Sequence, residues 1–285
     1  MASLALALFA SGCSGAGAPE DPSPPGFSEL VAADWSLPPG GEAHLCALQT
    51  IPEERFISAF RAVAPPGTHH ALLTVTEPTG ADGTFACDAG ALSDAMIFGS
   101  GIATPELTFP EGVAMRIPAG RQALLNLHLL NTGEGTLTGR SAVLARDAAE
   151  DAIEAEMIFA GTVDIDIPPG AEVTRTGHCT FDSDATVFDL WPHMHRYGRH
   201  MTVTHRTIQG STILHDGPYA FEEQLHHPIT PVLVRRGESI EVTCTWANTG
   251  PDEVRYGDSS LDEMCFAGIY RYPAAHAGLF CASGP

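Results

Sequence analysis

Basic residues are scarce in this sequence: 14 lysines and arginines stand against 35 aspartates and glutamates, for a formal net charge of -21 at pH 7. A nucleic-acid-binding protein needs a basic face to pair with phosphates, so this charge argues against that class. It also disfavours electrostatic docking on an anionic membrane. We therefore expect neither nucleic acid nor a charged membrane surface as a partner.

Several motifs of common enzymes are also missing. The sequence contains no G-x-S-x-G element, no P-loop and no G-x-G-x-x-G motif, so hydrolase, nucleotide-binding and dinucleotide-binding functions have no support. None of its seven cysteines forms a C-x-x-C pair, which argues against a zinc ribbon. The function must be sought in other residues.

Helix-forming stretches are scarce, whereas glycine and proline are frequent, at 29 and 22 residues. Such punctuation is typical of many short strands joined by turns. Only residues 145–158 are rich in Ala and Glu, and they lie mid-chain, where a linker between two domains would fall. Hydrophobic periodicity predicts strands over residues 42–51, 55–63, 70–77, 122–130, 187–195, 199–207 and 239–247.

The chain also echoes itself. Asn-Thr-Gly occurs at 131–133 and at 248–250, each time at the same offset after a glycine and a β-like run. This register places His128 opposite Thr245. A tripeptide turn at the end of a strand is a weak signal alone, but its recurrence indicates two similar halves.

A second repeat supports this division. Thr-Val-Thr occurs at 74–76, after the first histidine pair, and at 202–204, after the second. Together the repeats predict an all-β fold of two tandem, antiparallel, jelly-roll-like β-sandwiches, over residues 27–155 and 156–285.

The N-terminus carries an export signal. A short apolar run over residues 4–10 ends in Ala10-Ser11-Gly12-Cys13, which resembles a bacterial lipoprotein box; an ordinary signal peptide is the alternative. Cys13 would then be lipidated, and the rest of residues 1–26 would form a Gly/Ala/Pro/Ser-rich tether. We expect a protein of the periplasm or cell envelope that meets the membrane only through this anchor.

Six cysteines remain after Cys13, and an even number in an exported protein predicts three disulfides. Six cysteines allow 15 pairings, and the residues themselves do not choose among them. The six are Cys46, Cys87, Cys179, Cys244, Cys265 and Cys281.

Thirteen histidines are many for this length, and three of them suggest a metal site in the first half. His69 and His70 open a predicted strand. Neighbouring strand residues point to opposite faces, so both rings reach one metal only if His69 still lies in the preceding loop. His128 lies in a largely apolar strand, where an imidazole needs a partner such as a metal. Three imidazoles suit copper or zinc alike.

The second half contains His193 and His195, which strand alternation places on one face, whereas Met194 points the other way. Met264 lies in the acidic turn Asp262-Glu263-Met264-Cys265. A soft thioether beside two imidazoles favours Cu(I). The alternative is that Met264 is an ordinary core residue.

Taken in order, these groups resemble the pattern of the copper type II, ascorbate-dependent monooxygenases, the family of dopamine β-hydroxylase and peptidylglycine α-hydroxylating monooxygenase. The resemblance covers roughly residues 28–281. It implies two coppers per chain, with ascorbate or a similar reductant. An electron-transfer copper would be held by His69, His70 and His128. The copper that binds dioxygen beside a small-molecule substrate would be held by the catalytic set His193, His195 and Met264.

The resemblance also implies a disulfide pairing. The three pairs would be Cys46 with Cys87, Cys179 with Cys281, and Cys244 with Cys265. Each pair stays within one half of the chain. The last pair would hold the turn that carries Met264.

The sequence departs from the family at one important point. Peptidylglycine hydroxylases carry an arginine close before the His-x-His pair, where it holds the substrate carboxylate, but residues 189–192 contain none. Arg196 and Arg199 follow the pair and could replace it. Alternation places Trp191 on the same face as His193, so we expect its indole to line a pocket for a neutral, apolar or aromatic substrate.

Two other functions stay open on the residues alone. A non-catalytic periplasmic copper-binding or carrier protein would need the same ligands, and a structural sandwich with incidental histidines predicts no stoichiometric metal. We interpret His44, near Cys46, as structural and His226-His227-Pro228 as surface or packing.

Overall fold

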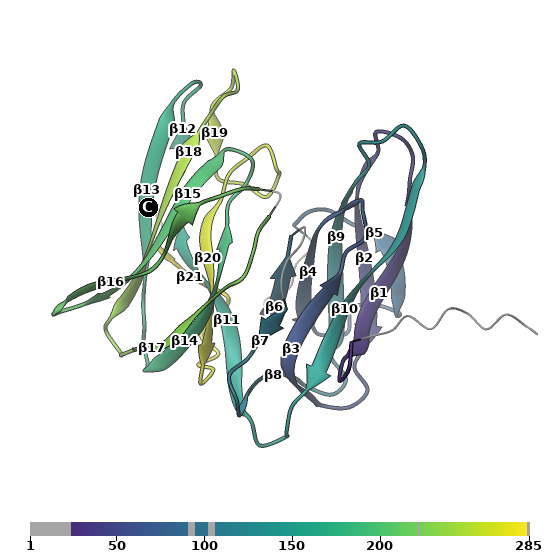
Figure 1. Cartoon of the computed structure of the whole chain (residues 1–285), viewed down its shortest axis with the longest axis horizontal. Coiled ribbons are helices and arrows are strands. Elements are labelled where there is room, and N and C mark those ends of the chain that lie inside the picture. The colour runs from purple at the N-terminus through teal and green to yellow at the C-terminus, as the bar shows by residue number, and fades with distance from the viewer. Residues whose placement is uncertain (1–23, 91–94, 102–105, 222, 284–285) are drawn as a thin grey trace, which may run out of the picture.

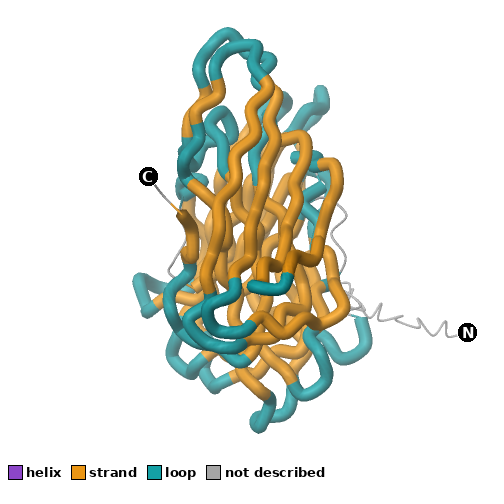
Figure 2. The backbone as a smooth tube through the Cα atoms, turned by 90° about the vertical axis from the view of Figure 1, so that its left-hand side faces the viewer, coloured by secondary structure: helices purple, strands orange, loops and turns teal. Residues whose placement is uncertain are grey.

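The computed structural model describes residues 24–283 except 91–94, 102–105 and 222. Cys13 and most of the predicted tether therefore lie outside the described residues. The described part of the chain forms strands and loops only, which confirms the predicted all-β class (Figure 2). No helix that could cross a membrane occurs in that part. Figure 1 shows two β-sandwiches side by side, the first in purple to teal and the second in green to yellow.

The first sandwich consists of two facing sheets. One contains, in order, β1 (Ser28–Leu37), β10 (Leu137–Asp147), β3 (Arg55–Val63) and β8 (Val113–Ile117), with the short β7 (Leu107–Thr108) beside β3. The other contains β5 (Gly83–Ala86), β2 (Glu42–Thr50), β9 (Gln122–Leu130), β4 (Thr68–Thr76) and β6 (Ala95–Ser100). Strand pairing within this sandwich is antiparallel.

The second sandwich repeats this plan. One sheet contains β11 (Ile153–Thr162), β20 (Cys265–Tyr272), β14 (Ala185–His193) and β17 (His227–Val234), with β21 (Phe280–Ser283) parallel to β11. The other contains β13 (Glu172–Thr180), β18 (Ser239–Ala247), β15 (Gly198–Thr207) and β16 (Gly210–Pro218). The short strands β12 (Asp166–Ile167) and β19 (Val254–Arg255) form a separate pair. All seven predicted strands are present, with ends that differ by two residues at most.

The Ala/Glu-rich stretch 145–158 does not form a helix. It comprises the end of β10, a turn and the start of β11. Glu154 and Glu156 alternate with the buried Ala155 and Met157, and this period of two is that of a strand. Tertiary packing on the alternate face outweighs the helical preference of Ala and Glu.

Strand β11 belongs to both sandwiches. Its first residues, Ile153 to Ala155, pair in parallel with β8, and residues 156–162 pair antiparallel with β20. A single ten-stranded sheet therefore runs through the molecule. The proposed division at residues 155 and 156 falls where β11 changes its partner, and it stays a proposal.

A buried asparagine makes the same hydrogen-bond network in each sandwich. Asn131 and Asn248 open the two Asn-Thr-Gly sequences and are 3% and 2% exposed. The amide of each donates to three backbone oxygens, those of Leu37, Pro38 and Gly135 for Asn131 and those of Ile167, Pro168 and Asp252 for Asn248. This echo of the sequence is therefore a structural duplication.

The strand register extends the duplication. In the first sandwich His70 pairs with His128, and in the second His200 pairs with Thr245. Both β4 and β15 are bulged directly before that histidine. His128 and Thr245 therefore occupy corresponding positions, in the register that the sequence predicted.

The Thr-Val-Thr repeat does not belong to this duplication. Thr202 pairs with Thr243, and the corresponding pair in the first sandwich is Leu72 with Asn126. The tripeptides at 74–76 and 202–204 are thus two positions out of register. Threonine and valine are common in strands of any origin, which explains the coincidence.

Three disulfides are present, one within the first sandwich and two within the second. They are Cys46–Cys87, Cys179–Cys281 and Cys244–Cys265, the pairs that the family resemblance implies. The second joins β13 to β21, and the third joins β18 to β20. Such bonds persist in oxidising compartments and indicate an extracytoplasmic location.

The duplicated asparagines lead to a stability prediction. Replacing Asn131 or Asn248 with Ala leaves buried carbonyls unpaired, at roughly 1–3 kcal/mol each. We expect each variant to lower the free energy of unfolding by about 2–4 kcal/mol in urea titrations. Gln209→Ala, at an exposed turn, is the control and should match the parent protein. Equal stability of all variants would contradict a structural role for the repeat.

Candidate metal centres

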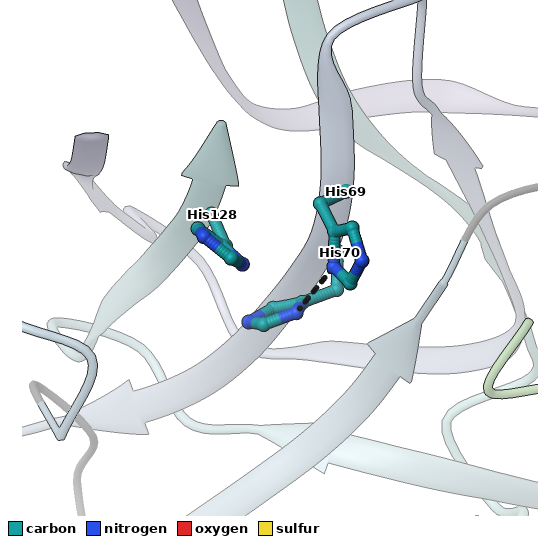
Figure 3. Close-up of side chains that lie close together, drawn as sticks. All are labelled: His69, His70 and His128. Atoms are coloured by element: carbon teal, nitrogen blue, oxygen red, sulfur yellow. Dashed lines mark hydrogen bonds between the residues drawn. The ribbon is translucent and has the colours of Figure 1, made fainter. Parts of the chain in front are cut away.

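The first histidine group is formed by β4 and β9. One ring nitrogen from each of His69, His70 and His128 lies within 4.8 Å of the others (Figure 3). The ring centroids of His128 are 5.0 Å from those of both other rings. The three side chains that the sequence singled out in the first half therefore converge on one point.

A β-bulge brings the adjacent histidines together. The expectation was that His69 had to lie in the loop before the strand, but it lies within β4. The register skips His69 between Thr68 and His70, so strict alternation is lost there. The Nδ1 atoms of His69 and His70 are 3.3 Å apart, on the same side of the sheet.

Burial keeps His70 neutral and leaves one nitrogen of His128 in need of a partner. Burial, followed by the neighbouring His128, holds the pKa of His70 well below its ordinary value. His128 Nε2 donates to Glu42 Oε1 at 2.7 Å, but its Nδ1 is buried with no hydrogen-bond partner among the described residues. An unpartnered, unprotonated ring nitrogen is the donor that a metal ion requires.

A fourth histidine supports the group. His44 was interpreted as structural, and its ring stacks on that of His128 with centroids 4.6 Å apart and planes 6° from parallel. Burial lowers the pKa of His44, so it too is neutral at pH 7. This stacking fixes the ring plane of His128.

The second group lies where β14 ends. His193 is the last residue of β14, and His195 follows it; their ring centroids are 5.3 Å apart. Burial lowers the pKa of His193 to about 3 and also lowers that of His195. Met264 directly precedes β20, and it lines one cavity together with His193 and His195.

Hydrogen bonds orient both rings. His193 Nδ1 donates to Gln224 Oε1 at 3.1 Å, and His195 Nδ1 donates to the backbone oxygen of Asp262 at 3.2 Å. Each ring therefore keeps its proton on Nδ1 and presents Nε2 as a lone pair. A metal-binding histidine usually donates its other ring N–H to such an acceptor, which fixes the orientation of the ring.

A buried carboxylate ties the ligand-bearing segments together. Glu263 is fully buried and accepts hydrogen bonds from the backbone N–H groups of His195 and Tyr197, at 2.9 and 2.6 Å. It also accepts from Trp246 Nε1 at 2.8 Å. Burial raises the pKa of Glu263 to about 7. With the adjacent Cys244–Cys265 disulfide, it fixes Met264 relative to His195.

Both groups border one cavity of about 510 Å³ between the sandwiches. Phe221, from the segment that joins β16 to β17, lies between them. Its ring centroid is 4.8 Å from that of His69 and 6.2 Å from that of His195. Residues far apart in the sequence thus bring the two histidine groups to one cavity.

Part of the wall of this cavity, beside His193, is aromatic. Trp191 is 1% exposed and stacks on His193, with ring centroids 5.1 Å apart. Phe159 and Phe266 continue the wall. The indole of Trp191 borders the cavity, and its N–H donates to the backbone oxygen of Gln224 at 2.9 Å. Trp191 therefore presents only apolar ring surface.

The two arginines that follow His193 and His195 lie in different places. Arg196 borders the cavity and stacks over the ring of Tyr197. Arg199 donates instead to the backbone oxygens of Arg196 and Gly198. Asp258 also borders the cavity.

Sequence reasoning missed Gln224 and Phe221, which no spacing pattern connects to the histidines. His226 follows them and is buried: Nδ1 is 2.8 Å from Asp189 Oδ1 and Nε2 is 2.9 Å from the backbone oxygen of Gly99. It thereby joins the second sandwich to the first. This agrees with its interpretation as a packing residue.

A comparison with protein families finds a match over the second half of the chain. Residues 153–284 match the model of the copper type II ascorbate-dependent monooxygenase, C-terminal domain. This stretch contains the second histidine group and Met264. No curated protein matches the chain.

Among solved structures, the capsid of the T13 particle of infectious bursal disease virus shares 11% identity, with 89% of this chain and 70% of that chain covered and a TM-score of 0.21. The same virus's Gt strain shares 9% identity, with 90% and 73% covered and a TM-score of 0.15. Likeness this slight supports no inference about fold or function.

The Gln224 contact can be tested directly. Gln224→Leu keeps the backbone oxygen for Trp191 but removes the acceptor for His193 Nδ1. Loss of such a partner typically weakens metal binding by about 10–100-fold. We expect that loss at the His193 group only, measured by competition with a chelator, and no change with Gln209→Leu. Unaltered affinity in Gln224→Leu would show that the hydrogen bond does not orient the ligand.

Proposed function

Through residues 153–284 the chain belongs to the copper type II, ascorbate-dependent monooxygenase family, and we propose that it hydroxylates a C–H bond of a small, neutral, apolar or aromatic molecule. The reaction would use O₂ and a one-electron reductant such as ascorbate. The observation that carries this proposal is that both histidine groups border one cavity, whose wall beside His193 is aromatic.

The donor sets suit copper at both groups. In the first, three imidazoles converge, and the buried Nδ1 of His128 has no hydrogen bond within the described structure. In the second, two imidazoles and the thioether of Met264 border the same space, a set that favours Cu(I) over zinc. When bound, copper supplies the one-electron chemistry and oxygen activation that side chains lack.

The protein's own residues position the reactants. Gln224 accepts a hydrogen bond from the His193 ring, and Glu263 accepts one from the backbone N–H of His195. Both histidines would therefore need little reorganisation when a metal binds. Trp191 and Phe159 exclude water from the wall beside them and offer apolar surface to a substrate. The chain's own residues would therefore orient the histidine ligands, hold the substrate and keep water away from it.

The same wall limits the substrate. Trp191 occupies the stretch where peptidylglycine hydroxylases carry their carboxylate-binding arginine, and its N–H is already bonded. A carboxylate left unpaired beside it would cost several kcal/mol. A neutral ring or alkyl group fits this surface better, which is why we propose a substrate of that class.

A lipid anchor is proposed for the N-terminus. The three disulfides support export, and Cys13 follows a short apolar run. An enzyme tethered at the cell envelope would meet its substrate outside the cytoplasm. Radiolabelled lipid should be incorporated into the parent protein and not into Cys13→Ser, and equal labelling of the two would contradict the anchor.

Met264 gives the most direct test of the reaction. Met264→Ile keeps apolar volume but removes the sulfur, so Cu(I) affinity at that group and turnover should fall on the order of 100-fold. His128→Ala is the matched variant: it should lose one copper per chain and leave the Met264 group loaded. Copper content, ascorbate oxidation and O₂ uptake are measured together. Copper binding without coupled O₂ uptake would instead identify a non-catalytic copper carrier.

Substrate preference tests the proposal that Trp191 favours a neutral substrate over a carboxylate. Wild type should turn over a neutral phenylethyl compound at least about ten-fold better, in kcat/KM, than a glycine-extended peptide acid. Arg196→Gln should leave this preference unchanged, because Arg196 is not expected to bind the substrate. A wild type that prefers the acid, and loses that preference in Arg196→Gln, would assign Arg196 the carboxylate-binding role.

A further inference from the structure

A pair of histidines lies at the lateral edge of the second sandwich, away from the central cavity. His215 in β16 pairs with Val203, and His227 in β17 pairs with Leu190. Val203 and Leu190 are fully buried core residues. Directly paired residues share a face of the sheet, so both imidazoles point into the space between the two sheets.

Apolar side chains normally fill that space. The His215 and His227 ring centroids are 4.4 Å apart, with the planes at 57°. This is somewhat closer than the 5.0 to 5.5 Å found within the two candidate centres. In the part of the chain that the structure describes, neither ring makes a hydrogen bond. Polar groups that face a core without a partner are unfavourable unless a ligand satisfies them.

The two rings are neutral donors at physiological pH. Burial lowers the pKa of His215 to about 4, with His227 as the next cause. Burial likewise lowers the pKa of His227. Each imidazole therefore keeps an unprotonated nitrogen whose lone pair has no proton to compete with a metal ion.

A small cavity of about 50 Å³ lies beside the pair and is bordered by His215, His227 and Glu223. Its volume holds one ion or water molecule and little else. We propose that His215 and His227 form a third metal site, which binds a divalent transition metal such as Zn(II) or Cu(II). Without a thioether, this pair has none of the Cu(I) preference of the Met264 group.

The site would close the edge of the sandwich. β16 and β17 are edge strands of facing sheets, joined by the segment that carries Phe221 and Gln224. A metal shared by His215 and His227 would hold the two ends of that segment together. The neighbouring His226 already anchors it to the first sandwich. The ion would therefore be structural, in a cavity separate from the one that both candidate centres border.

Metal counting on the full, disulfide-bonded chain tests this proposal. Metal-free protein is titrated with Zn(II), and bound metal is counted after removal of the excess. His215→Gln and His227→Gln should each bind one equivalent less than wild type, and the double variant should lose no more than either single one. His276→Gln, an exposed histidine beside Glu154, is the control and should bind the wild-type number.

Leucine variants separate metal loss from misfolding. His215→Leu and His227→Leu place apolar groups at the sandwich edge, so their metal-free forms should melt at or above the wild-type temperature and still lose one equivalent. Zn(II) should raise the melting temperature of wild type more than theirs. If the variants bind as much metal as wild type, the third site does not exist. The comparison is a difference between variants, so its failure would leave the proposed function untouched.

Discussion

The indole of Trp191 lies against the backbone of Gly99, and this contact brings the two sandwiches close enough for their histidines to share a cavity. A Cβ atom added at Gly99 would lie only 2.7 Å from the Trp191 ring, so a larger residue would force the strands apart. The carbonyl of Gly99 also bonds His226, and the indole N–H bonds Gln224. One close approach thus sets the interface, the aromatic wall and the position of the ligand-orienting residue.

Duplication of the sandwich did not duplicate the first histidine group. The first group lies on β4 and β9, and the positions that correspond to His70 and His128 are His200 and Thr245. The second group lies instead at the end of β14. This strand belongs to the ten-stranded sheet, whereas β4 and β9 belong to the separate five-stranded sheet. Because each sandwich places its group on the side that faces its neighbour, two similar folds form one asymmetric site.

Strand periodicity and histidine spacing made the all-β fold and the two groups predictable from the sequence. Alternation placed His193 and His195 together, and apolar neighbours of His128 indicated burial. The bulge at His69 was not predictable, because it depends on pairing with β9. Gln224 and Phe221 were missed for a similar reason: their partners come from other strands and, for Phe221, from the other sandwich. The sharing of β11 escaped prediction because its alternating residues also read as helix formers.

The central claim is that both groups bind metal within one cavity of one chain, with Phe221 in contact with rings from each. Dipolar coupling between Cu(II) ions, measured by electron paramagnetic resonance on the fully loaded protein, tests it most directly. We expect strong short-range coupling in wild type, which disappears in His128→Ala although the His193 group keeps its copper. Two fully loaded groups without such coupling, or coupling that survives in His128→Ala, would contradict the shared site.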